Sequence, residues 1–529
     1  MSERRLSPSD AVWLYSEWPK NLQTVSSLTW MDREIDPQDY RDVVQERMVD
    51  KYPTFRQRIR KSRNPLFMPY WEDDPDFSLD NHIEVIQLEA PGDRAALAKL
   101  VSVQRSTALD MERPLWKFFV IQGYEGTTAV HARIQHAIAD GWALTRLVLS
   151  LADEASAEAP KVVDKTPKRK RDSAIKAAQP AVDAVDTVTD TVKRAVDAVT
   201  ETAAKAAGAV VGAVKQPGNV PAILAQGQDA LSETLSLDLN PDRFLEFGSK
   251  GPAAVAQTFG RASDEVSERV ESAGDAAGVV AQGAKDAIDF VVTPRPGKTI
   301  MHGKVSGTKK VAWIDPIPLE PVRAAGKSLG ATINDVLLGC LTNSLRLYLL
   351  EKDALNVTEL MTSVPVSLRK PNDPLPRTLG NRFGLVNVLL PVGTEDPIDQ
   401  ILSLKAQIDE IKSSQMPVVS FGLISVSSLF TPDVERLLHK LTQDQSLGVT
   451  TNVPGPRSPM KLAGGVVKGT WGMGGLSGNM NLSVGIFSLA GEINFAVSSD
   501  EAITPDPERI LDHFKESVQI VLDRTGAAS

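Results

Sequence analysis

The sequence predicts a mixed α/β (α+β) fold built from two globular halves, and three observations lead to this prediction. Strand-like alternation and helix-like periodicity both occur near each end of the chain. At 529 residues, the chain is longer than one simple core usually is. The composition changes between the two ends, because no aromatic residue occurs from Leu151 to Arg243. We therefore expect an N-terminal half over 1–155, an insert over 156–296 and a C-terminal half over 297–529.

Three segments of the first half have clear periodic patterns. Residues 39–52 and 142–152 carry apolar side chains at helical spacing, so each predicts a helix. Residues 127–134 alternate between apolar and polar side chains, as a strand does. The expected order is therefore helix, strand and helix, with a tight turn between the last two.

The insert, residues 156–296, is rich in Ala, Val, Asp, Thr and Lys. A basic cluster opens it, and a narrow valine stripe at three- and four-residue spacing follows: Lys165, Lys168, Arg169, Lys170 and Arg171, then Val182, Val185, Val188, Val192, Val196 and Val199. A basic cluster before an amphipathic helix is typical of segments that lie on an anionic membrane or lipid droplet. The alternative is a solvated, partly disordered linker, because valine is a mediocre helix former and buries little area.

The second half returns to a globular composition. Residues 319–350 have helical periodicity, and residues 505–522 predict an amphipathic helix at the end of the chain. Residues 465–499 alternate glycine, polar and β-branched residues, which predicts strands joined by tight turns.

Composition and charge exclude several classes of function. Net charge is −9, which argues against a general nucleic-acid binder, so we expect no nucleic-acid partner. The single cysteine, Cys340, lies in an apolar run and is interpreted as a buried hydrophobe. The histidines show no metal-ligand spacing, so we expect no metal. Neither a signal peptide nor a run of about 18 apolar residues is present, which predicts a cytoplasmic protein without a spanning helix.

The segment most indicative of chemistry is 134–141 (IQHAIADG), where a predicted strand enters a tight turn and then a helix. A neutral imidazole suits proton abstraction from a hydroxyl near pH 7, so His136 is the candidate general base. Asp140 is expected to support the turn, through a backbone hydrogen bond or an ion pair with a distant arginine. Gly141 is expected to turn with positive φ or to pass close to another segment. The plainer alternative for His136 is a polar residue near the surface.

This element resembles the His-His-x-x-x-Asp-Gly signature of acyl-CoA-dependent acyltransferases and condensation domains. Seven further segments resemble, in order, motifs of the bacterial wax ester synthase/diacylglycerol acyltransferase family: 6–11 (LSPSDA), 53–58 (PTFRQR), 113–116 (RPLW), 330–336 (GATINDV), 364–369 (VPVSLR), 380–384 (GNRFG) and 452–456 (NVPGP). The resemblance covers residues 5–155 and 296–525.

The chain departs from the family pattern at three places. Gln135 stands where the family has its first histidine, whereas His136 matches the second, which is the base in the wider superfamily. Gln135 can still form hydrogen bonds, so we expect activity. The insert is longer than the family's usual linker, and Ser488-Leu489 stands in place of a Ser-Tyr pair.

The resemblance implies two chloramphenicol acetyltransferase-like domains with a tunnel at their interface and His136 midway along it. Acyl-CoA, as co-substrate, would enter from one side and a lipid alcohol from the other, with no cofactor. The alkoxide would attack the thioester, and His136 would return the proton to the CoA thiolate.

Several other residues are expected to shape this site. Arg369 would pair with a carboxylate across the interface or meet a CoA phosphate, and Pro114, Leu115 and Trp116 would pack nearby. Asn334 and Asp335 would either cap a helix or make a catalytic contact. Asn481 and Ser483 would either contact the oxyanion or be ordinary polar residues of a strand.

The expected function is transfer of a long-chain acyl group to a diacylglycerol or a long-chain alcohol, giving triacylglycerol or wax ester for storage. The enzyme would lie in the cytoplasm, peripheral to the inner face of the membrane or on lipid droplets. One alternative is a non-catalytic lipid-droplet or membrane-binding homologue, in which Gln135 marks a lost activity. Another is a condensation-type enzyme that uses carrier-bound thioesters.

Overall fold

The computed structural model describes residues 4–62, 68–153, 296–370, 373–414, 416–427 and 446–527. The chain divides into two compact units, one made of residues 1–165 and 293–529 and the other of residues 166–292. The description below concerns the first unit. The basic cluster and valine stripe predicted in the insert lie outside the described residues.

A six-stranded sheet forms the centre of the first half, in the order β13-β14-β2-β7-β6-β5. Its strands are β2 (Thr24–Met31), β5 (Ile83–Gln87), β6 (Trp116–Tyr124), β7 (Thr127–Gln135), β13 (Lys461–Leu462) and β14 (Gly465–Met473). Strand β14 comes from the second half of the sequence and pairs antiparallel with β2, from Val467 opposite Met31 to Met473 opposite Ser26. The two halves therefore share this sheet.

Helices cover both faces of this sheet. They are α1 (Pro8–Tyr15), α2 (Pro37–Val44), the π-helical turn η1 (Gln45–Val49), α3 (Arg94–Ser106) and α4 (Gly141–Leu151). Smaller elements are η2 (Pro53–Arg56), η3 (Leu79–Asn81) and a sheet of β1 (Arg4–Arg5), β4 (Tyr70–Asp73) and β3 (Gln57–Arg60). The predicted helices over 39–52 and 142–152 and the strand over 127–134 are confirmed as α2 with η1, α4 and β7.

The second half contains a seven-stranded sheet, in the order β11-β10-β12-β15-β16-β8 with β9 paired to β16. Its strands are β8 (Lys309–Trp313), β9 (Ile317–Pro318), β10 (Leu360–Ser367), β11 (Phe383–Leu390), β12 (Ser446–Pro454), β15 (Leu482–Leu489) and β16 (Glu492–Asp500). The strands predicted over 465–499 are confirmed as β14, β15 and β16.

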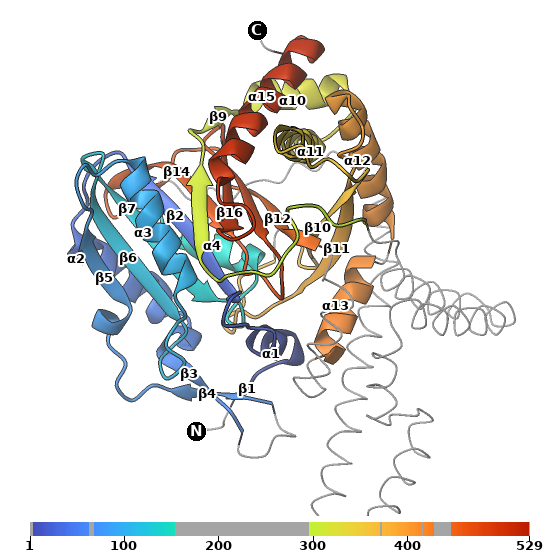
Figure 1. Ribbon diagram of the computed structural model, residues 1–529. Helices are drawn as coiled ribbons and strands as arrows, with labels where there is room; N and C mark the ends of the chain where they lie inside the picture. Colours follow the sequence, from blue (N-terminus) through green and yellow to red (C-terminus); the bar gives the residue numbers. More distant parts are fainter. Residues whose placement is uncertain are drawn as a thin grey trace, which may run out of the picture. The chain divides into compact units, whose positions relative to one another are not determined.

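The helices of the second half are α10 (Leu319–Ser328), α11 (Ile333–Glu351), α12 (Pro397–Ser413), α13 (Met416–Ser427) and α15 (Pro507–Thr525). Helix α11 packs against α10, α12 and α15 (Figure 1). The helical periodicity predicted over 319–350 corresponds to α10 and α11, which are separated because Gly330 adopts a left-handed φ of 63° and Thr332 then caps α11. Cys340 on α11 is fully buried, and burial raises the pKa of its thiol to about 12.

Close approach of α11 and α12 depends on one glycine. A Cβ atom at Gly339 would lie 2.3 Å from Cγ1 of Ile401, which is closer than packed carbon atoms come. The core of this half surrounds the contact and includes Phe495 and Phe514, whose ring centroids are 3.7 Å apart. A third apolar cluster joins α3 to β8, β14 and β16, and so links the two halves.

Strand β11 is the edge of the seven-stranded sheet, yet at two of its residues both the backbone N–H and the carbonyl bond to side chains of neighbouring helices. The hydroxyl of Ser420 on α13 donates to the carbonyl of Leu385 and accepts from the N–H of the same residue. The side-chain amide of Gln407 on α12 does the same at Leu389. Two polar side chains thus take the place of a neighbouring strand. Among the described residues, no helix is both long and apolar enough to cross a bilayer.

Candidate active site

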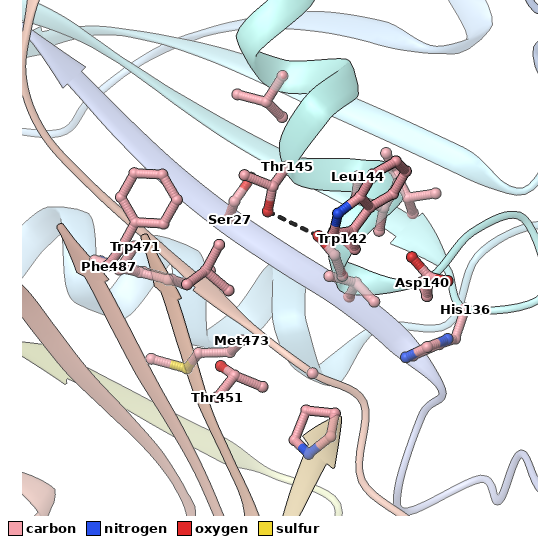
Figure 2. A pocket seen from close by; sticks show the side chains of 18 of the residues that line it. Ser27, His136, Asp140, Trp142, Leu144, Thr145, Thr451, Trp471, Met473 and Phe487 are labelled. Atoms are coloured by element: carbon pink, nitrogen blue, oxygen red, sulfur yellow. Dashed lines mark hydrogen bonds between the residues drawn. The ribbon is translucent and has the colours of Figure 1, made fainter. Parts of the chain in front are cut away.

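A cavity of about 330 Å³ lies between the two halves and is lined mainly by apolar side chains. The first half contributes β2, β7 and α4, and the second half contributes β10, β11, β12, β14 and β15. Figure 2 shows His136 and Asp140 beside each other on one side of the cavity, with Thr451, Met473 and Phe487 on the strands opposite. The cavity therefore presents an imidazole to an apolar space.

His136 is the first residue after β7, where the strand turns toward α4. Its backbone N–H donates to the carbonyl of Gln23, at 2.8 Å, and its side chain is almost fully buried. The imidazole stacks on the indole of Trp13, with centroids 4.2 Å apart, and lies 5.4 Å from the ring of Phe383. Stacking on Trp13 holds the plane of the imidazole.

An amide and a carboxylate lie behind the imidazole. Nδ1 of His136 is 3.0 Å from Oδ1 of Asn381, and Nδ2 of Asn381 donates to the carbonyl of His136 at 2.8 Å. The same Nδ2 donates to Oδ1 of Asp10, also at 2.8 Å. Asp10 lies in the first turn of α1, and Asn381 lies just before β11, so this contact joins the two halves.

Burial lowers the pKa of the His136 imidazole, and the negative charge of Asp140 and a hydrogen bond with Asn381 oppose this only in part. An imidazole with a lowered pKa is neutral at pH 7 and carries a free lone pair. The arrangement can therefore accept a proton from a hydroxyl group in the cavity.

Asp140 holds the turn and connects it to the second half. Its Oδ1 accepts from the N–H of Ala143, at 2.8 Å, and so caps α4. Its Oδ2 accepts from the N–H of Arg382 at 2.8 Å and pairs with Nε of Arg369 at 3.3 Å. Arg369 also donates to the carbonyls of Leu379 and Gly380. Both supports expected of Asp140, a backbone hydrogen bond and a distant arginine, are present in the structure.

The expectation for Gly141 is wrong. Gly141 is the first residue of α4 and its φ is not in the left-handed region, because the N1 position of a helix has ordinary helical geometry. A Cβ atom there would meet nothing within 4 Å, so no segment passes close to it. Gly141 instead lines the cavity, and a side chain at this position would occupy open space.

Gln135 is not among the residues that line the cavity. Its Nε2 donates to the carbonyl of Trp13 at 3.0 Å, and its Oε1 accepts from the N–H of Ala137. Gln135 therefore supports α1, which carries Trp13, and the turn that follows His136.

We expect Gln135→Leu to destabilise the protein by about 1–3 kcal/mol, because two buried peptide groups would lose their partners. Gln135→His should be close to wild type, since a neutral imidazole also offers one donor and one acceptor. Urea unfolding and initial-rate assays of the two variants would check this. Equal stability of Gln135→Leu and wild type would contradict the supporting role.

The Pro114-Leu115-Trp116 segment also lies outside the cavity lining. The carbonyl of Leu115 accepts from the N–H of Gln135 at 2.9 Å, which fixes the end of β7. The Trp116 indole donates to the carbonyl of Phe55 at 2.9 Å and stacks on His82. This segment packs in the core behind the site.

Asn334 and Asp335 lie in the first turn of α11. Thr332 is the N-cap residue, and Asp335 completes a capping box by accepting from the N–H of Thr332 at 2.8 Å. Oδ1 of Asn334 accepts from Nδ2 of Asn452 at 3.1 Å, and Asn452 lines the cavity. Asn334 therefore contacts a residue of the cavity wall rather than the cavity.

Asn481 and Ser483 are buried and lie outside the cavity lining. Nδ2 of Asn481 donates to Thr504 at 2.7 Å, and its Oδ1 accepts from the N–H of Asp500 at 3.0 Å. The hydroxyl of Ser483 donates to the carbonyl of Gly474 at 3.1 Å. Both side chains thus hold local structure in the second half.

Comparisons with known proteins agree with this architecture. Residues 6–236 match the sequence profile described as the wax ester synthase/diacylglycerol acyltransferase catalytic domain, and residues 379–521 match the C-terminal domain of the same family. A putative diacylglycerol O-acyltransferase of Mycobacterium tuberculosis is 24% identical over 535 residues, covering 98% of this chain and 90% of that protein. Another from that species is 26% identical over 528 residues, covering 97% of this chain and 98% of that protein.

Solved structures with a similar fold include two groups of proteins. The wax ester synthase/diacylglycerol acyltransferase from Marinobacter aquaeolei VT8 has a TM-score of 0.60 at 18% identity, covering 99% of this chain and 100% of that one. The first condensation domain of the calcium-dependent antibiotic synthetase, in complex with a substrate analogue, has a TM-score of 0.53 at 12% identity, with 99% and 96% covered. The predicted fold class is thereby confirmed.

Proposed function

Because this chain belongs to the wax ester synthase/diacylglycerol acyltransferase family, we propose that it transfers a long-chain acyl group from acyl-CoA to a lipid alcohol. The acceptor is a diacylglycerol or a long-chain alcohol, and the product is triacylglycerol or wax ester. One observation carries the proposal, namely that the neutral, buried imidazole of His136 faces an apolar cavity between the two halves.

In the proposed reaction, a ring nitrogen of His136 takes the proton of the acceptor hydroxyl as its oxygen attacks the thioester carbonyl. A C–O bond forms and a tetrahedral oxyanion results. The oxyanion collapses, the C–S bond breaks, and the imidazolium gives its proton to the CoA thiolate. The apolar walls favour this reaction over hydrolysis, because they limit access of water to the thioester.

The acceptors in this proposal are membrane lipids, so the enzyme would meet them at the surface of a membrane or a lipid droplet. The sequence of the insert supports this step, because a basic cluster followed by an apolar stripe is typical of segments bound to such surfaces.

The test measures transfer of a labelled palmitoyl group from palmitoyl-CoA to hexadecanol or to a diacylglycerol. The enzyme is the purified full chain, and the acceptor is presented in vesicles. We expect labelled ester with at least one acceptor, and the preferred acceptor identifies the product class. A reaction without acceptor measures thioester hydrolysis. Release of free palmitate without any ester would overturn the proposal. Binding of palmitoyl-CoA without ester formation with any acceptor would also overturn it and would favour a non-catalytic lipid-binding homologue.

A further inference from the structure

We propose that Asp10 and Asn381 act as a positioning pair that fixes the tautomer of His136, so that Nδ1 carries the proton and Nε2 is the basic nitrogen. This inference rests on the proposed function of His136 as the base. Asp10 and Asn381 do not line the cavity, so both would act on the substrate through the imidazole of His136.

The orientation of the Asn381 amide follows from its partners. Nδ2 has two hydrogens, and its two neighbours, Oδ1 of Asp10 and the carbonyl of His136, only accept hydrogen bonds. The opposite orientation would place the amide oxygen against a carboxylate and a carbonyl. The oxygen of Asn381 therefore faces Nδ1 of His136, at 3.0 Å, and because an amide oxygen cannot donate, Nδ1 must carry the proton.

The other ring nitrogen is left free for chemistry. Among the described residues, Nε2 of His136 has no hydrogen-bond partner. It is nevertheless accessible, whereas Nε2 of His82 and Nε2 of His131 are unpaired and fully buried. His136 lines the cavity, so Nε2 is the nitrogen that a substrate hydroxyl can reach. Stacking on Trp13 sets the plane of the ring, and Asn381 sets which edge of the ring points to the cavity.

Asp10 is itself held in place by several donors. Its Oδ1 accepts from both the backbone N–H and the side chain of Asn381, each at 2.8 Å, and its Oδ2 accepts from the Ser7 hydroxyl at 2.6 Å. Burial raises the pKa of Asp10, and these hydrogen bonds favour its carboxylate form. Gly380 allows this contact, because its φ of 76° lies in the left-handed region that glycine adopts without strain.

An amide between carboxylate and imidazole has a specific chemical advantage. A carboxylate in direct contact with Nδ1 would raise the pKa of the imidazole, so that more of it would be protonated at pH 7. Asn381 provides the same orientation without a charge at that position, while the carboxylate of Asp10 polarises the amide and strengthens its oxygen as an acceptor. Within the described part of the chain, Asp140 is the charged group that raises the pKa of the ring, and Arg369 is the partner of Asp140.

The test uses Asn381→Leu, Asn381→Asp and, as a matched control, Asn387→Leu. Asn387 lies further along β11 and contacts Ser363, not His136. For Asn381→Leu we expect kcat to fall by about 10²-fold at every pH with little change in KM, because the base loses its fixed tautomer. Asn387→Leu should keep wild-type rates.

Asn381→Asp separates positioning from a purely structural role. The acidic residue still accepts from Nδ1–H, but it no longer donates to Asp10 or to the carbonyl of His136. Because burial raises the pKa of Asp10, we expect Asp10 to take up a proton and donate to the new carboxylate, so that activity at pH 8 stays above that of Asn381→Leu. Because negative charge then lies against the imidazole, its pKa rises and the acidic limb of the kcat/KM profile moves up by about 1–3 pH units. In wild type this limb should inflect below 6.5, since burial lowers the pKa of His136 below that value.

The tautomer itself can be read without turnover. In ¹⁵N spectra of histidine-labelled protein, the His136 signals, assigned by their loss in His136→Gln, should show a protonated Nδ1 in wild type and not in Asn381→Leu. A protonated Nε2 in wild type, an unchanged acidic limb in Asn381→Asp, or wild-type kcat in Asn381→Leu would each overturn the positioning pair. Failure of wild type to form any ester would instead overturn the proposed function and leave the tautomer result standing.

Discussion

Replacement of His136 by alanine is expected to lower kcat for ester formation by about 10²–10⁴-fold, because general base catalysis contributes that much to a reaction of this kind. Only Nε2 of this imidazole is presented to the cavity as a neutral base, since burial lowers its pKa and Nδ1 is bonded to Asn381. KM for acyl-CoA should change little, because the apolar walls remain. Initial rates with saturating palmitoyl-CoA and the preferred acceptor measure the loss.

The matched control for this variant is His513→Ala. His513 lies on α15, bonds to Glu351 near the protein surface, and does not line the cavity. This variant should retain wild-type kcat. Thermal unfolding of both proteins tests whether they fold, because the alanine at 136 also removes the stacking contact with Trp13. Equal turnover by His136→Ala and wild type would remove His136 from the mechanism.

Asp140→Ala is expected to produce the largest loss of stability, about 3–5 kcal/mol. The substitution leaves the guanidinium of Arg369 without its buried carboxylate, and breaking one partner of a buried pair has an effect of that size. It also removes the cap of α4 and the acceptor for the N–H of Arg382. Because the turn then loses its side-chain contacts with Arg369 and Arg382, next to Asn381, kcat should fall as well, by about 10²-fold.

Asp93→Ala is the natural comparison, because the exposed side chain of Asp93 caps α3 in the same way, by accepting from the N–H of Ala96. This substitution should reduce the free energy of unfolding by about 1 kcal/mol and leave kcat unchanged. Urea unfolding followed by tryptophan fluorescence gives both values. If the two variants were equally stable, Asp140 would be a simple helix cap without a role in joining the halves.

Much of the local structure could be predicted from the sequence because it depends on local periodicity. Strand β7, helix α4 and the turn between them follow from alternation, helical spacing and the Asp140 cap, all within one short segment. The terminal helix α15 and strands β14 to β16 follow in the same way. The helical periodicity over 319–350 shows the limit, since it does not reveal the break between α10 and α11 at the left-handed backbone of Gly330.

The remaining parts depend on contacts between segments that are distant in the sequence. Asp10 and Asn381 are 371 residues apart, so no pattern within either motif reveals that they meet behind His136. The motifs that contain them were recognisable, but their roles were not. The pairing of β14 with β2 could not be anticipated either, because a strand pattern does not specify which half supplies its partner.

The side chains along β11 also bear on how this protein behaves among copies of itself. An edge strand with free peptide groups is a template onto which a strand of another molecule can add, which leads to fibres or swapped assemblies. Here Ser420 and Gln407 occupy the hydrogen-bonding positions of Leu385 and Leu389, so an incoming strand finds no unbroken row of donors and acceptors. The edge strand β11 is therefore a poor template for strand addition between copies of this protein.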